Sequence, residues 1–212
     1  MIELTFTLLG DGPSDAALIP ILRWTLKQCM QPSAIQADFA DLRRLPNPLH
    51  DLPGRIQQAL ELYPCDVLFV HRDAENQDPE LRYCEIKEAM ERLDTRIVKP
   101  RYVCVVPVRM QEAWLLIDQA AIRRAAGNPN GTADLVLPAV GLIESITNPK
   151  GLLYELLKAA SELRGRRLKK FRPDKHVRLI AEIISDFSPL RQLPAFRRLE
   201  VDILRLAETP IS

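Results

Sequence analysis

Three short apolar runs, each ended by a polar turn, constrain the fold of this chain more than any other feature. The runs cover residues 4–9, 66–70 and 102–108 and are rich in residues that favour β-strands. The segments after the first two runs, near residues 14–26 and 79–93, repeat apolar residues at helical spacing. Strands that alternate with helices pair in parallel through right-handed crossovers. We therefore predict an α/β fold with an open, mostly parallel sheet flanked by helices.

Weaker patterns complete the expected layout. A further strand is predicted near residues 35–39, and a helix is predicted over residues 54–62 after a proline-rich loop. From residue 119 onward the apolar spacing is helical throughout, and the segment GNPNG at residues 127–131 is a clear loop signal. We expect a core over residues 1–118 and a C-terminal helical extension, residues 119–212, packed on that core.

The overall charge and hydropathy narrow the possible partners. Lys and Arg total 29 against 28 for Asp and Glu, so nucleic-acid binding would have to rely on local basic clusters. No apolar run approaches the roughly 20 residues of a membrane helix, and the first residues do not resemble a signal peptide. The four cysteines are scattered without a C-x-x-C pair, which favours buried thiols over disulfides or zinc. We expect a cytoplasmic protein without a membrane partner.

Acidic residues follow each of the three strong strand signals. Asp11 and Asp15 come after the first, Asp73 and Glu75 after the second, and Glu112 after the third. Because parallel strands end at one shared edge, these five carboxylates are expected to converge there. Crowded carboxylates resist ionisation unless a cation neutralises them, and an oxygen-only cluster suits Mg²⁺ or Mn²⁺ better than zinc.

Each acidic residue also has an ordinary structural interpretation. Asp15 in the first turn of a helix complements the helix dipole, and residues 73–76 are typical of a polar turn. Their joint placement after successive strands favours a functional site. The Gly10-x-Gly12 pair lacks the third glycine of a dinucleotide-binding fingerprint, and the sequence contains no phosphate-binding loop of the Walker type.

Two of these segments resemble the motifs of a known domain. LGDGPSD at residues 9–15 resembles the first motif of the topoisomerase–primase (Toprim) domain, and LFVHRDAE at residues 68–75 resembles its second motif. PVRMQEAWLLID at residues 107–118, a late Lys175 before a helix and PAF at residues 194–196 are similar to a small uncharacterised bacterial Toprim-like family. That family is related to the overcoming-lysogenization-defect type of defence nuclease.

The resemblance implies roles for the residues of the two motifs. Asp11, at a position where Glu is usual, would ligate metal or act as general base. Asp73 and Glu75 would hold Mg²⁺, with Glu75 standing where the family has Asp. Each exchange shifts a carboxylate by one methylene, which matters for an ion that demands near-octahedral geometry. These two exchanges are also compatible with an inactive descendant of the family.

The resemblance also implies roles for residues outside the two motifs. Asp15 and Glu112 match positions that contribute to a second metal in the defence nucleases. Those enzymes use a lysine to stabilise charge at the scissile phosphate, and Lys175 is the first candidate here, with Lys150 second. His71, directly before the second acidic motif, is interpreted as a hydrogen-bonded structural residue, with proton transfer as the alternative.

A basic run in the extension is the expected nucleic-acid-binding surface. It consists of Arg164, Arg166, Arg167, Lys169, Lys170 and Arg172. Phe171 within it is available for stacking on a base. A solvated basic helix end is the alternative interpretation of the same run.

The expected function is metal-dependent cleavage of a DNA or RNA backbone by a Toprim-like endonuclease. By the resemblance, the setting is bacterial anti-phage defence, with control by a partner ATPase subunit. The alternative is a non-catalytic Toprim-like subunit whose helical tail docks onto an ATPase or onto a second copy of the chain, as a homo-oligomer. Phosphoryl chemistry on a small molecule is a third class, which would make the basic run dispensable.

Overall fold

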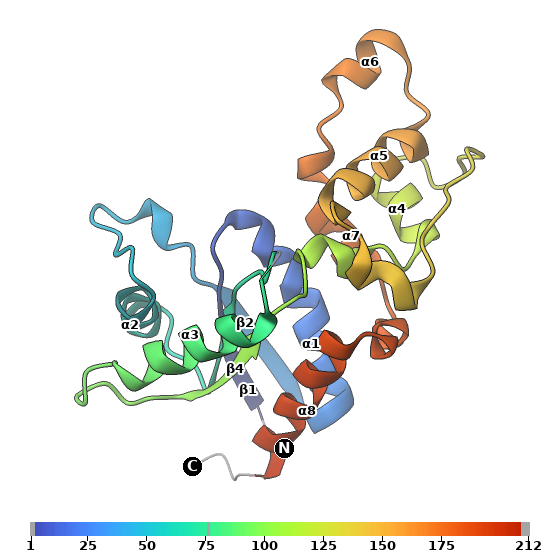
Figure 1. The fold of residues 1–212 in the computed structure, drawn as a ribbon. Coiled ribbons are helices and arrows are strands. Elements are labelled where there is room, and N and C mark those ends of the chain that lie inside the picture. The colour runs from blue at the N-terminus through green and yellow to red at the C-terminus, as the bar shows by residue number, and fades with distance from the viewer. Residues whose placement is uncertain (1–2, 76, 209–212) are drawn as a thin grey trace.

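A computed structural model describes residues 3–75 and 77–208 of the chain. Four strands form an open, entirely parallel sheet in the order β2-β1-β3-β4 (Figure 1). They are β1 (Glu3–Leu9), β2 (Ala34–Phe39), β3 (Val67–His71) and β4 (Arg101–Val105). The predicted α/β class is confirmed, including the strand that was expected near residues 35–39.

Helices cover both faces of the sheet. Alternate side chains of β3 point to opposite faces, so Phe69 belongs to one apolar cluster and Leu68 to the other. α2 (Leu52–Leu62) and α3 (Pro79–Glu91) close the face of Leu68. α1 (Leu18–Met30) packs on the face of Phe69, where Phe6 and Phe69 meet edge to face at 5.2 Å. All five residues of β3 are buried, as expected for a central strand covered on both faces.

The C-terminal part is helical, as predicted. It contains α4 (Gln119–Ala125), α5 (Pro149–Ser161), α6 (Gly165–Lys170), α7 (Val177–Ile183) and α8 (Pro194–Glu208). α8 returns to the sheet beside α1 (Figure 1), and Phe196 on α8 meets the buried ring of Trp114 edge to face at 5.5 Å. At the other end of α8, Arg101 of β4 donates a hydrogen bond to the carbonyl of Leu206. The helical residues thus share one apolar cluster with the sheet.

Three local details differ from the expectations. β4 ends at Val105, before the predicted limit of residue 108, and Pro107 has no N–H with which to continue a ladder. The segment after β1 begins as a short 3₁₀ helix, η1 (Pro13–Ala17), and becomes α-helical only at Leu18. The cysteines are free thiols, as expected, but Cys84 is exposed and the other three are only partly buried, so the expectation of burial holds in part.

Hydropathy along the helices bears on the membrane question. Within residues 3–75 and 77–208, none of the helices combines the length and the apolar character that a membrane span requires.

Candidate functional site

Three of the five predicted carboxylates gather beyond the ends of the strands. Asp15 lies in η1 after β1, Asp73 follows β3, and Glu112 lies in η3 (Gln111–Leu115) after β4. Because β1, β3 and β4 are adjacent and parallel in the described sheet, the segments that follow them meet at one edge. The convergence predicted from the sequence therefore holds for these three residues, which we call the acidic cluster.

Asp15 is the most fully hydrogen-bonded member of the cluster. It is only 5% exposed, and its Oδ2 accepts from the backbone N–H groups of Asp11 at 2.7 Å and Gly12 at 3.0 Å. Its Oδ1 accepts from Nε2 of Gln111 at 2.9 Å. A Cβ at Gly10 would lie 2.5 Å from Oδ2, so the close approach of Asp15 requires glycine there. The loop after β1 is built around this carboxylate.

His71 connects the cluster to the sheet. His71 is 2% exposed, and its Nδ1 lies 2.9 Å from the carbonyl oxygen of Val105. Because a carbonyl only accepts, Nδ1 carries the proton of this bond. Nε2 faces the carboxylates, 3.4 Å from Oδ1 of Asp73 and 3.9 Å from Oδ2 of Asp15. The structural role expected for His71 is thus present, and its second nitrogen is directed at the cluster.

The carboxyl of Asp73 has a raised pKa. Burial raises the pKa of Asp73 to about 6, and the nearby charges of Asp15 and Glu112 act in the same direction. His71 and the N–H of Gln111, which donates to Oδ1 at 3.1 Å, oppose the rise. The cluster therefore holds more negative charge than its surroundings stabilise, which is the situation that a cation relieves.

Glu112 is neutralised by a lysine from the helical extension. Its side chain is buried, and Nζ of Lys150, in the first turn of α5, lies 3.2 Å from Oε1. Burial lowers the pKa of Lys150, but the charge and hydrogen bond of Glu112 more than offset this, so the pKa lies above its ordinary value. The helical extension thus supplies a positively charged ammonium group to the edge of the sheet.

The donor set at the cluster is compatible with a hard cation. Oε1 of Gln111 is buried and has no hydrogen-bond partner among the described residues, which leaves an unused oxygen beside the carboxylates. Across the part of the chain that the structure describes, three or more His, Cys, Asp or Glu side chains nowhere form a ready-made metal cage. Mg²⁺ usually keeps several waters and needs only one or two carboxylates, so the cluster fits a hydrated ion better than a fully enclosed one.

Asp11 and Glu75, the other two predicted acidic residues, are arranged differently. Oδ1 of Asp11 accepts from Arg55 at 2.8 Å and from Arg72 at 3.2 Å, and its side chain is 46% exposed. Glu75 is exposed and has a left-handed backbone with φ of 56°. That conformation is strained for a residue other than glycine and marks the turn that follows Asp73.

The remaining predicted site residues lie in the helical part. Lys175, in the short helix η5 (Pro173–Lys175), is exposed, whereas Lys150 contacts a cluster carboxylate directly. The six basic residues proposed to bind nucleic acid are exposed around α6, which lies at the outer end of the helical part, away from the sheet (Figure 1). Phe171 already stacks on His176, with ring centroids 4.7 Å apart.

Sequence reasoning missed Gln111 and the two arginines that hold Asp11. Gln111 stands beside Glu112 in the motif of residues 107–118, so its sequence position could have indicated that it lies at the site. Arg55 and Arg72 come from α2 and from the segment after β3, and nothing in their local sequence indicates that they meet at Asp11. No family model, curated protein or solved structure matches this chain, so the site is interpreted from its own geometry.

Proposed function

We propose that this protein is a metal-dependent nuclease that cleaves phosphodiester bonds in DNA or RNA. The observation that carries the proposal is the acidic cluster: three carboxylates from three strand ends, with an unpartnered amide oxygen and a lysine beside them. Such a combination has a place for a cation and for the phosphate that the cation attracts. The resemblance to Toprim-like defence nucleases supports the same reaction class.

The cluster residues would hold Mg²⁺ or Mn²⁺ through oxygen atoms. Asp73 and Asp15 are the first candidates, because His71 Nε2 faces both, and Glu112 and the free oxygen of Gln111 complete the donor set. When bound, the ion would polarise the phosphodiester and lower the pKa of a coordinated water. Asp11 takes a secondary place in this proposal, because its charge is shared by two arginines.

Two side chains of the chain itself have further tasks. Nε2 of His71 faces the carboxylates and can hold or pass a proton at that atom, while the Val105 carbonyl fixes the ring. Lys150 can direct its ammonium group at the charge that builds up on the phosphate oxygens. Each of the two groups lies next to a carboxylate of the acidic cluster, His71 beside Asp73 and Lys150 beside Glu112.

Metal removal provides the direct test. Purified protein is incubated with plasmid DNA, single-stranded DNA and tRNA in Mg²⁺, in Mn²⁺ or in EDTA, alone and with any ATPase that copurifies. We expect cleavage of at least one substrate with either metal and none in EDTA, together with a saturable heat of Mg²⁺ binding by calorimetry. Cleavage that persists in EDTA contradicts the proposal. Absence of both cleavage and metal binding would favour the non-catalytic subunit.

The lysine assignment is tested by a matched pair of variants. Lys150→Met should lower the cleavage rate about 100-fold, since removal of one preorganised charge-stabilising group typically costs that much. Lys175→Met should leave the rate within about threefold, because Lys175 is exposed and a single surface contact to a polyanion contributes little. Single-turnover rates at saturating Mg²⁺ provide the comparison, and the reverse order of effects would restore Lys175 as the catalytic lysine.

The wider setting follows from the resemblance and stays a proposal. An effector in anti-phage defence, located in the cytoplasm and controlled by a partner ATPase, is the setting in which the similar nucleases act. The exposed basic residues around α6 would bind substrate backbone at a distance from the acidic cluster. A long nucleic acid that spans both regions is the substrate that this arrangement suits.

A further inference from the structure

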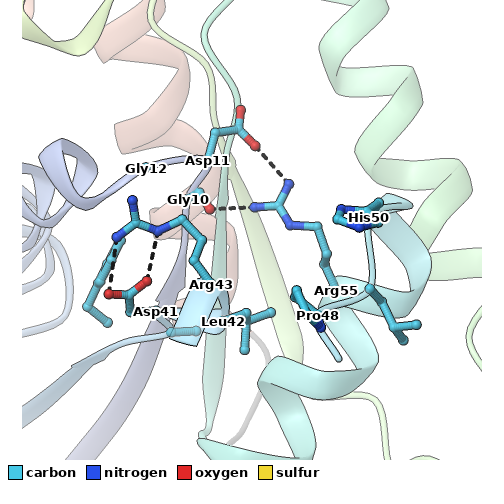
Figure 2. A pocket seen from close by; sticks show the side chains of 12 residues that line it. Gly10, Asp11, Gly12, Asp41, Leu42, Arg43, Pro48, His50 and Arg55 are labelled. Atoms are coloured by element: carbon cyan, nitrogen blue, oxygen red, sulfur yellow. Dashed lines mark hydrogen bonds and ion pairs between the residues drawn. The ribbon is translucent and has the colours of Figure 1, made fainter. Parts of the chain in front are cut away.

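A pocket of about 400 Å³ lies beside the loop that follows β1 (Figure 2). Its walls come from that loop, from the segment after β2 and from the residues that precede α2. Asp11 lines this pocket with its side chain, while its backbone N–H donates to Asp15 of the acidic cluster, which does not line the pocket. One short loop therefore separates the pocket from the proposed reaction centre.

The charges that line the pocket cancel in pairs. Arg43 forms a two-point ion pair with Asp41, through Nε at 2.9 Å and Nη2 at 3.1 Å. Arg55 binds Oδ1 of Asp11 at 2.8 Å and the carbonyl oxygen of Gly10 at 2.5 Å, as Figure 2 shows. Each guanidinium thus has a carboxylate partner, so the pocket has little net attraction for a bare anion such as phosphate.

The shape and chemistry of the walls suit a flat ring. A guanidinium that is hydrogen-bonded in its own plane keeps its faces available for stacking, which is how arginine holds nucleobases. Arg43 retains 52% of its side-chain exposure despite its ion pair. Phe39, Leu42 and Pro48 add apolar surface, and His50 adds a further aromatic ring at the rim. A mostly uncharged wall with a few hydrogen-bonding groups is typical of a small-ligand pocket.

We propose that this pocket holds the nucleobase of the nucleotide next to the scissile phosphate. The inference rests on the proposed nuclease function, because it takes the acidic cluster as the place of the phosphate. A nucleotide with its phosphate at the cluster and its base across residues 10–12 would contact both sides of one loop. The pocket would then position the substrate strand and set any preference among bases, with Arg43 as the stacking residue.

The test measures nucleotide binding without metal, so that it is independent of cleavage. The full chain, labelled with ¹⁵N, is titrated in EDTA with ribo- and deoxyribonucleoside 5′-monophosphates, with ribose 5-phosphate and with inorganic phosphate. We expect saturable amide shifts at residues 10–12, 39–43 and 49–50 with nucleotides. The two phosphates that lack a base should not produce this pattern. A pattern that maps elsewhere, or one that phosphate alone reproduces, overturns the proposal.

Substitutions at Arg43 separate stacking from charge. Arg43→Ala and Arg43→Lys should both weaken nucleotide binding at least about fivefold, since stacking on one base contributes on this scale and lysine keeps the charge but not the plane. Arg92→Ala removes a comparable exposed arginine, paired with Glu88 on α3, and should leave binding unchanged. Full binding by Arg43→Lys would refute stacking. If nucleotides bind at the pocket but the protein cleaves no substrate, the pocket assignment is supported. That result contradicts only the proposed metal-dependent cleavage.

Discussion

Replacing Asp73 by asparagine will make the metal-free protein more stable at pH 8, by about 2 to 3 kcal/mol, and will leave its stability at pH 4 nearly unchanged. The reason is the pKa of Asp73, which burial and the neighbouring carboxylates raise from 3.8 to about 6. The fold therefore favours the protonated carboxyl. Its contribution to stability is fully present below pH 4 and is lost as the pH rises through 6.

Urea denaturation in EDTA at pH 4, 6 and 8 measures this effect. Asparagine cannot ionise, so the variant avoids the cost of a buried charge at pH 8, and its advantage should shrink steadily toward pH 4. Asp134→Asn is the matched control, because Asp134 is exposed and its substitution should change stability little at any pH. Equal effects of Asp73→Asn at all three pH values would show that the buried charge is not what destabilises the protein.

Magnesium should reverse the sign of this effect at pH 8. A bound cation favours the ionised carboxylate, and it stabilises the folded state of a variant only if that variant can bind it. Wild-type protein should therefore gain stability as Mg²⁺ is added, while Asp73→Asn gains little and cleaves no substrate. A variant that is more stable and inactive would identify Asp73 as a residue kept for function at a cost in stability.

The sheet could be predicted from the sequence because its central strands are short apolar runs with abrupt polar ends. β3 is buried along its whole length, and such runs have few other places in a fold. Topology predicted that acidic residues would meet at one edge of the sheet, since parallel neighbours end at the same edge, and this prediction holds for Asp15, Asp73 and Glu112. Predicting strand ends was harder at β4, where Pro107 stops the ladder before the apolar pattern stops.

The parts that could not be predicted depend on side chains from distant segments. Whether the carboxylate of Asp11 or that of Asp15 joins the cluster is decided by Arg55, which is 44 residues away in sequence, and by the fit of Asp15 against Gly10. Lys150 lies in the first turn of α5 and Lys175 ends η5, and only the packing of α5 near η3 brings one of the two lysines to Glu112. Local sequence patterns do not indicate which side chains from distant segments come into contact.

The two aspartates of the first motif should differ in their importance for cleavage. Asp15→Asn should reduce cleavage about 1000-fold or more, because loss of an ion-holding carboxylate removes several kcal/mol of charge stabilisation. Asp11→Asn should reduce cleavage by no more than about tenfold, since the charge of Asp11 is already engaged by Arg55 and Arg72.

Both variants should remain folded, which makes the comparison informative. In Asp15→Asn the remaining side-chain oxygen can accept from the loop N–H groups. The new amide takes the place of the oxygen that accepts from Nε2 of Gln111, so it gains an acceptor when the Gln111 amide turns over and presents Oε1, which has no partner in the described structure of the wild type. Rates and Mg²⁺ affinity are measured for both variants, with thermal unfolding as the check on folding. If Asp11→Asn is the inactive variant and Asp15→Asn still binds metal, the role that the Toprim resemblance gives to Asp11 stands, and its arginine partners must release it when the ion binds.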